Sequence, residues 1–263
     1  MRYRALALDV DGTLISAAQK KISASTTEAL KNLQSRGVTV ILATGRSGFA
    51  SVGSILGTDF LPDWRVCANG AQILDRFGCC LQEKRFTSQD VDRITGFVLL
   101  HDLPLTFTFE DAYYVYNKYE EYIDFYTSRA GPVPYLYDGS SHDRHRQSLP
   151  FGAYIIKMPG RLGAELAGVC PSIKLMETNP DAFDVSPGDA DKRHGVAWVL
   201  SRLGIGFDEL VAVGDSENDA ELLMAAGLGA VIADAPEGIR GLADFVTGSV
   251  TEDGVVGVIE RFF

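Results

Sequence analysis

The 263-residue chain lacks a long apolar run. No segment approaches the roughly 20 apolar residues that a membrane span requires, so we expect no membrane segment. The basic first residues precede only a short apolar stretch, which indicates a first strand and not a signal peptide. Cysteine is scarce, and Cys67, Cys79, Cys80 and Cys170 form no CxxC pair. This pattern predicts free thiols in a reducing cytoplasm and no structural zinc.

Positive charge is in deficit, with 24 Lys and Arg against 35 Asp and Glu and a formal net charge of −11. Such an acidic surface repels phosphate backbones, so we expect no nucleic-acid partner. A small phosphorylated substrate is not excluded, because a metal ion and a few local cations reverse the field inside one site. The chain has no GxxxxGK[ST] motif and no GxGxxG after the first strand, so neither a P-loop nor a dinucleotide-binding domain is predicted.

Strand and helix patterns alternate in the first and last thirds of the chain. The expected strands are residues 5–8, 38–43, 65–68, 210–213 and 229–233. The expected helices are residues 26–36, 47–56, 194–203 and 218–226. This alternation predicts an α/β fold, with a Rossmann-like core whose parallel sheet has helices on both faces.

The middle of the chain is rich in aromatic residues and breaks this alternation. Its expected elements are strands at 106–110, 112–117 and 153–158 and a helix at 119–129. We therefore predict a core formed by residues 1–82 and 188–263, with an inserted α+β domain formed by residues 83–187.

Two patterns in this insertion have competing interpretations. Tyr119, Tyr122 and Tyr126 lie at helical spacing, which favours a contribution to the core of the insertion over a wall of a substrate site. His142-x-x-His145 has the spacing of a metal pair, but its polar surroundings favour a surface loop.

The hexapeptide Asp9-Val10-Asp11-Gly12-Thr13-Leu14 directly follows the first expected strand. Two carboxylates two residues apart stand where open α/β sheets bind ligands. A shared hard cation such as Mg²⁺ would help to keep both ionised. The alternative is a strand that ends in an acidic turn.

Three further segments carry candidate groups. The second strand is followed by Thr44, Gly45 and Arg46. Their hydroxyl, backbone N–H and guanidinium suit an anion site. The alternative is a helix cap beside a surface arginine. Asp215 follows a later strand and is placed to complete the metal site, while Asn218 and Asp219 open the next helix and are alternatively caps. Lys192 precedes a helix, where it either neutralises phosphoryl oxygens or is solvated.

Together, these segments resemble the phosphatase branch of the haloacid dehalogenase (HAD) superfamily. Asn69-Gly70-Ala71 and residues 232–256 also resemble its Cof-type subfamily, which carries an α/β cap of the C2B type between the Thr44 and Lys192 motifs. The resemblance implies Asp9 as the nucleophile that forms an aspartyl-phosphate, and Asp11 as the acid and base.

The resemblance also implies binding roles. Thr44, Gly45, Arg46, Lys192 and Asn218 would bind the substrate phosphate, and Thr44 and Lys192 would also act in catalysis. Mg²⁺ would be held by Asp9, the backbone carbonyl of Asp11 and Asp215, with Asn218 and Asp219 supporting the metal shell and Lys192.

The chain departs from the subfamily pattern at two places. Lys192-Arg193-His194-Gly195 replaces the usual Lys-Gly, and Asp234-Ala235 replaces the usual Asn-Ala, which puts an extra carboxylate near the mouth of the site.

The motifs together predict a Mg²⁺-dependent phosphatase of small phosphorylated metabolites, with sugar phosphates first, whose mobile cap excludes water. The alternatives are a phosphomutase of sugar phosphates and a non-catalytic phosphometabolite-binding protein. The sequence does not predict an oligomeric state.

Overall fold

The computed structural model describes residues 2–16, 21–55, 60–130, 135–179 and 181–263. The chain divides into two compact units, which we call unit 1 and unit 2. Unit 1 comprises Met1–Gln82 and Asp191–Phe263, and unit 2 comprises Glu83–Ala190.

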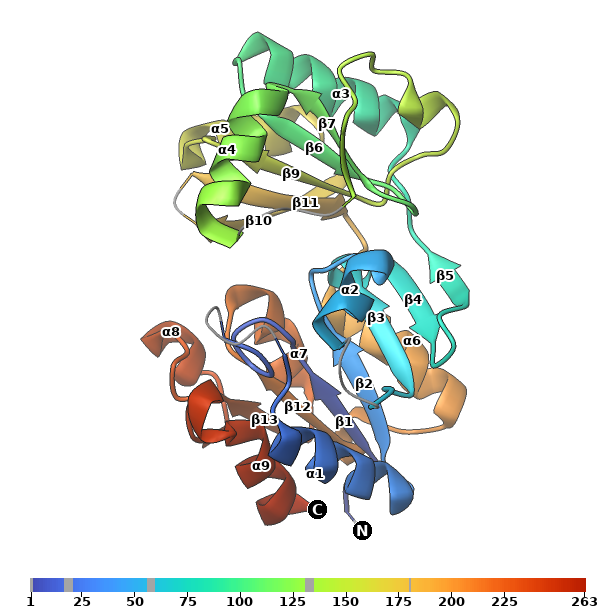
Figure 1. Ribbon diagram of the computed structural model, residues 1–263, viewed down its shortest axis with the longest axis vertical. Helices are drawn as coiled ribbons and strands as arrows, with labels where there is room; N and C mark the ends of the chain where they lie inside the picture. Colours follow the sequence, from blue (N-terminus) through green and yellow to red (C-terminus); the bar gives the residue numbers. More distant parts are fainter. Residues whose placement is uncertain (1, 17–20, 56–59, 131–134, 180) are drawn as a thin grey trace. The chain divides into compact units, whose positions relative to one another are not determined.

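Unit 1 is built on a sheet with the strand order β14-β13-β12-β1-β2-β3-β4-β5 (Figure 1). The strands are β1 (Ala5–Leu8), β2 (Thr39–Ala43), β3 (Trp64–Cys67), β4 (Gln72–Asp75), β5 (Cys80–Glu83), β12 (Leu210–Gly214), β13 (Leu228–Val231) and β14 (Phe245–Val246). The run from β14 to β3 is parallel, and β4 is antiparallel to β3. The predicted α/β fold with a parallel-sheet core is therefore confirmed.

Helices cover both faces of this sheet because its central strands are apolar on both faces. Leu6 and Leu8 pack with α1 (Ala24–Ser35) and α9 (Gly254–Phe262), whereas Ala5 and Ala7 pack with α6 (Lys192–Leu203) and α7 (Ala220–Ala225). The remaining helices of unit 1 are α2 (Gly48–Ile55) and α8 (Glu237–Arg240). Residue 56, the predicted end of the second helix, lies outside the described residues.

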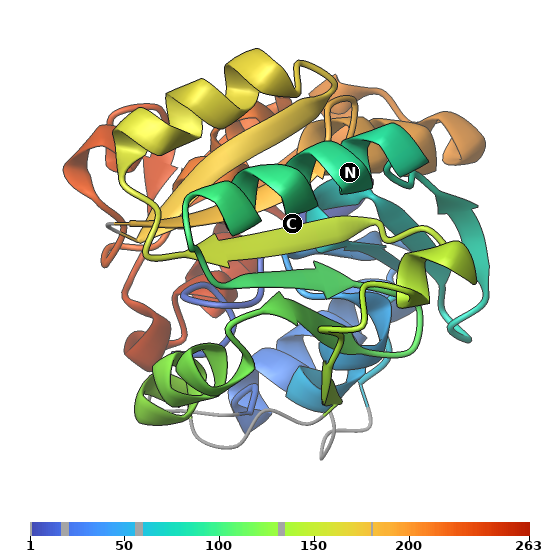
Figure 2. The ribbon, with the colours of Figure 1, turned by 90° about the horizontal axis from the view of Figure 1, so that it is seen from above.

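Unit 2 has a mostly antiparallel sheet with the order β10-β11-β9-β6-β7-β8, in which only the β7–β8 pair is parallel among the described strands. The strands are β6 (Leu105–Thr108), β7 (Tyr113–Asn117), β8 (Leu136–Asp138), β9 (Gly152–Ile156), β10 (Ile173–Asn179) and β11 (Ala182–Pro187). Helices α3 (Ser88–Leu100) and α5 (Gly160–Val169) lie over one face, as Figure 2 shows. Helix α4 (Tyr119–Ala130) packs on the other face through Tyr122, with Tyr119 and Tyr126 beside it, so this tyrosine stripe contributes to a core.

His142 and His145 of the insertion both contact Tyr116. The ring of His142 stacks on the Tyr116 ring at 5.3 Å between centroids, and His145 Nδ1 lies 3.0 Å from the Tyr116 hydroxyl. Both histidines are half-buried and lie between β8 and β9, with their rings against this tyrosine, which is compatible with the surface-loop interpretation.

Several elements differ from the sequence-based expectation. The helix predicted at 218–226 is a 3-10 turn, Glu217–Asp219, followed by α7. The Asp219 carboxylate accepts the N–H groups of Asp215 and Ser216, which directly precede this turn. Helices α3 and α5 and strands β4, β5, β8, β10, β11 and β14 (Phe245–Val246) were not predicted. None of the helices in the described part of the chain has the length and apolar character for a membrane crossing, and all four cysteines are free thiols.

Candidate active site

Four polar segments lie at one edge of the unit 1 sheet. Asp9 follows β1, Thr44 follows β2, Asn69 follows β3 and Asp215 follows β12. These four strands are neighbours and run parallel, so their carboxyl ends meet at the same edge. The sheet order thereby brings together groups as distant in the chain as Asp9 and Asp215.

Lys192 is the first residue of α6, which begins there because the Asp191 side chain accepts the N–H of His194. The Lys192 side chain is fully buried, and its Nζ donates to Asp9 Oδ1 at 2.6 Å, Asp219 Oδ1 at 2.7 Å and Asn218 Oδ1 at 3.1 Å. Burial lowers the pKa of this ammonium, but the carboxylates of Asp219 and Asp9 outweigh burial and raise the pKa above its ordinary value. Lys192 therefore stays charged in the interior.

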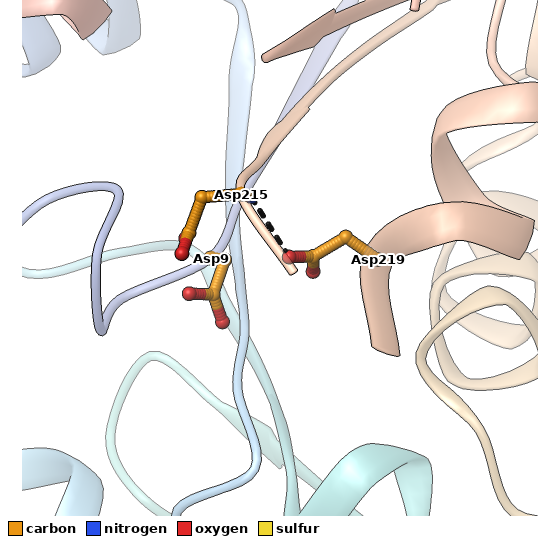
Figure 3. A group of neighbouring side chains, drawn as sticks. All are labelled: Asp9, Asp215 and Asp219. Atoms are coloured by element: carbon orange, nitrogen blue, oxygen red, sulfur yellow. Dashed lines mark hydrogen bonds between the residues drawn. The ribbon is translucent and has the colours of Figure 1, made fainter. Parts of the chain in front are cut away.

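The carboxylates of Asp9, Asp215 and Asp219 form an acidic cluster in which one oxygen of each lies within 4.8 Å of the others (Figure 3). Burial raises the pKa of Asp9 well above its usual range, with Asp219 and Asp215 adding to the rise and Lys192 opposing it. Burial likewise raises the pKa of Asp215 to about 6, against the lowering effect of a hydrogen bond from Thr13 Oγ1 at 2.7 Å. One lysine thus does not fully compensate the charge of three acids.

Asp219 is committed to protein contacts through both oxygens. Its Oδ1 accepts from Lys192, and its Oδ2 accepts the backbone N–H groups of Asp215 and Ser216, each at 3.1 Å. The carboxylate thus holds the loop that presents Asp215 while it pairs with the lysine. A supporting role for Asp219 stays a prediction.

Asp9 and Asp215 remain as the pair that suits a hard divalent cation, because carboxylate oxygens are its preferred ligands. Among the described residues, Lys192 is the side chain that donates to Asp9. Gly12 has a φ of +90°, and a Cβ at this position would lie 2.2 Å from Asp215 Oδ2. Glycine keeps that space open, so the residues fit such an ion.

Asp11 and Arg46 form a bidentate ion pair. Arg46 Nε donates to Asp11 Oδ2 at 2.7 Å and Nη2 donates to Oδ1 at 2.5 Å, while both side chains are partly exposed. The sequence predicts Arg46 as a phosphate ligand, and the structure places its guanidinium on Asp11. The Thr44 hydroxyl accepts the backbone N–H of Arg46 at 3.1 Å. This hydrogen bond stabilises the tight turn at exposed Gly45.

A match to a family model extends over residues 6–259, and the model describes haloacid dehalogenase-like hydrolases. The chain belongs to this family. That membership confirms the resemblance drawn from the sequence.

Relatives and solved structures match the whole length of this HAD-like hydrolase. Phosphatase YwpJ of Bacillus subtilis is 27% identical, over 97% of this chain and 98% of its own. The 5-amino-6-(5-phospho-D-ribitylamino)uracil phosphatase YcsE of the same organism is 25% identical, over 98% of this chain and 94% of its own. BT1666 from Bacteroides thetaiotaomicron, a HAD phosphatase, superposes with a TM-score of 0.87 at 22% identity, over 99% of this chain and 95% of that one, which shows the shared fold.

The departures of this HAD-like hydrolase from the Cof-type pattern have local explanations. Gly195 lies where a Cβ would be 2.4 Å from Val66 Cγ1, so the glycine after Lys192 serves the packing of α6 on β3. Arg193 lies over the Phe207 ring, and His194 Nδ1 lies 2.7 Å from Asp191 Oδ2. Exposed Asp234 accepts the N–H of Val250 at 3.1 Å.

Two further residues belong to this site although the sequence patterns assign no role to them. Thr13 lies within the first motif and donates to Asp215. Asn69 lies in the segment that resembles the Cof-type subfamily, and it accepts from Asn218 Nδ2 at 3.2 Å. A hydroxyl inside an acidic motif is a usable signal for Thr13, whereas the Asn69 contact joins residues 149 positions apart.

Proposed function

We propose that this HAD-like hydrolase is a Mg²⁺-dependent phosphatase that hydrolyses small phosphorylated metabolites, sugar phosphates first, through an aspartyl-phosphate on Asp9. The observation that carries the proposal is the fully buried Lys192 ammonium, which contacts Asp9 while Asp215 and Asp219 surround both. A buried cation beside a buried carboxylate is the environment in which a phosphate dianion is neutralised as a carboxylate attacks it.

In the first step, Asp9 Oδ2, the oxygen that does not accept from Lys192, attacks phosphorus. The bond from phosphorus to the ester oxygen breaks. Asp11, once it has left its ion pair with Arg46 and taken up a proton, donates that proton to the departing oxygen, so the alcohol leaves neutral. Lys192 and the Thr44 turn hold the transferring phosphoryl group in line, which supplies positioning and charge neutralisation.

In the second step, Asp11 accepts a proton from water, and the water oxygen attacks phosphorus. The bond from phosphorus to Asp9 breaks, inorganic phosphate leaves and the Asp9 carboxylate is regenerated. Splitting one displacement into two lowers the barrier of each. When bound by Asp9 and Asp215, Mg²⁺ supplies positive charge that lowers the repulsion between the carboxylate and the phosphate.

We further propose that unit 2 is the cap that selects the leaving group, since it is inserted between the Thr44 and Lys192 segments. Phosphorylated ribityl and sugar chains are the first substrates to test, because YcsE acts on a ribityl phosphate by name. The acidic chain and its free thiols support a cytoplasmic enzyme with no nucleic-acid or membrane partner.

The test is a panel of sugar, polyol and carboxylic-acid phosphates assayed for phosphate release with Mg²⁺ and with EDTA. We expect release that requires the cation. An isomerised sugar phosphate without free phosphate would instead identify a phosphomutase, and binding without turnover across the panel would identify a non-catalytic binding protein. Either result contradicts the proposal.

The raised pKa of Asp215 predicts how the cation and pH act on stability. An unfolded aspartate has a pKa of about 3.9, so the folded chain binds this proton more tightly. The resulting stability is present below about pH 4 and is lost as the pH rises through about 6. In metal-free buffer, the melting temperature of the wild type should therefore fall more between about pH 5 and pH 8 than that of Asp215→Asn.

Mg²⁺ competes with the proton for the same oxygens. Its addition should raise the melting temperature more at about pH 8 than at about pH 5. Thermal melts at both pH values, with and without the cation, check this. An equal effect of Mg²⁺ at both pH values, or the same pH slope in Asp215→Asn, would contradict it.

A further inference from the structure

The turn after β3 adopts an uncommon backbone conformation. Ala68, Asn69 and Gly70 have φ values of +48°, +50° and +91°, so three successive residues are left-handed. This region disfavours residues with a Cβ, and such strain persists only where the surroundings impose it. At Gly70, a Cβ would lie 2.0 Å from the carbonyl oxygen of Asp191, so α6 presses directly on the turn.

The backbone of the turn is attached to the Thr44 segment. The Asn69 N–H donates to the Thr44 carbonyl at 3.1 Å, and the Ala68 N–H donates to the Arg46 carbonyl at 2.7 Å. The Asn69 side chain lies against the same segment, because a Cβ on Gly45 would stand 3.2 Å from Asn69 Oδ1. The turn therefore positions the backbone that we propose as the phosphate seat.

The side chain of Asn69 reaches the lysine from the other direction. Its Oδ1 accepts from Asn218 Nδ2 at 3.2 Å, and Asn218 Oδ1 accepts from Lys192 Nζ at 3.1 Å. The Asn218 oxygen also accepts from Ser216 Oγ at 2.8 Å. With its amide nitrogen held by Asn69, Asn218 must turn its oxygen to Lys192.

We propose that Asn69 is a positioning residue that couples the Thr44–Gly45 segment to Lys192 through Asn218. It thereby fixes the Thr44 hydroxyl and the Gly45 backbone relative to the Lys192 ammonium, so that all three contact a phosphoryl group at the same time. Asn69 is 4% exposed, and among non-glycine residues asparagine tolerates its φ of +50° well. The proposal rests on the phosphoryl-transfer function proposed above.

The first test replaces Asn69 with glycine, which accepts the left-handed backbone and removes only the side chain. We expect kcat to fall about tenfold or more with KM within about twofold, because the lost alignment matters most in the transition state. The melting temperature should stay within about 2 °C of the wild type. Asp181→Gly is the matched control, because Asp181 is also left-handed at φ +66° and lies in unit 2, and its kcat should be unchanged.

The second test is Asn69→Asp, which keeps an acceptor for Asn218 but places a negative charge against Gly45. For Asn69→Asp, KM should rise by about tenfold while kcat falls less than in Asn69→Gly. The main effect is thus on KM, whereas in Asn69→Gly it is on kcat. Titration with inorganic phosphate should show the same loss of affinity in Asn69→Asp and little in Asn69→Gly. A residue that served folding alone would lower the melting temperature and produce neither split.

A double-mutant cycle completes the test. If Asn69 acts through Asn218, Asn69→Gly with Asn218→Ala should lose no more kcat than Asn218→Ala alone. Losses that multiply, or wild-type kcat in Asn69→Gly, would overturn the positioning role. The absence of phosphate release by the wild type from the whole panel would instead contradict the proposed function.

Discussion

Asp9→Asn is expected to lower phosphate release by at least about 10⁴-fold, because the amide keeps the shape of the side chain but lacks the nucleophilic oxygen. Asp9 Oδ1 is held by Lys192 at 2.6 Å, and an asparagine oxygen can accept the same hydrogen bond. Burial raises the pKa of Asp9, so loss of the charge should not destabilise the metal-free fold. Steady-state phosphate release and thermal melts measure both effects.

Two companion variants make this result specific. Asp244→Asn is the control, since Asp244 lies in the same unit and its carboxylate accepts only the Gly229 N–H among the contacts described; its activity should be unchanged. Asp11→Asn should accumulate the aspartyl-phosphate with an activated ester, because attack by Asp9 remains while activation of water is lost. Near wild-type turnover by Asp9→Asn would remove the nucleophile and the mechanism with it.

Lys192→Met is expected to reduce both stability and catalysis. The substitution leaves Asp9 and Asp219 buried without their cation, and breaking a buried pair from one side costs about 3–5 kcal/mol of the free energy of unfolding. The loss of a cation that faces the transferring phosphoryl group should lower kcat by about 10²–10³-fold. The stability loss should grow with pH, since burial raises the pKa of Asp9 and this carboxylate then ionises without its cation.

Denaturant unfolding followed by tryptophan fluorescence measures this loss in unit 1 alone. Both tryptophans of the chain, Trp64 and Trp198, lie in unit 1, with ring centroids 6.2 Å apart. The control is Arg76→Met in the same unit, whose partly exposed ion pair with Asp63 should contribute about 1 kcal/mol or less. Equal stability of Lys192→Met and the wild type would show that Lys192 does not compensate the acidic cluster.

Some helices and strands were missed because their signals are local and weak or because they depend on distant partners. The start of α3 carries a capping box between Thr87 and Asp90, a pattern that sequence reading can detect. Strands β10 and β11 pair with each other in unit 2, where β11 is buried at all but one of its positions and β10 becomes exposed toward its end. Their short mixed pattern looks like loop until the pairing partner is known.

The sequence by itself determined the family, the parallel core and the groups that follow each core strand. Apolar runs that end in Asp9, Thr44 or Asp215 are local patterns, and parallel pairing then brings their ends to one edge. Only the tertiary structure decided that Lys192 is buried among carboxylates, that Arg46 pairs with Asp11, and that Asn69 reaches Asn218. Burial and side-chain partnership depend on loops far apart in the chain, because desolvation is a property of the packed whole and not of a residue and its neighbours in sequence.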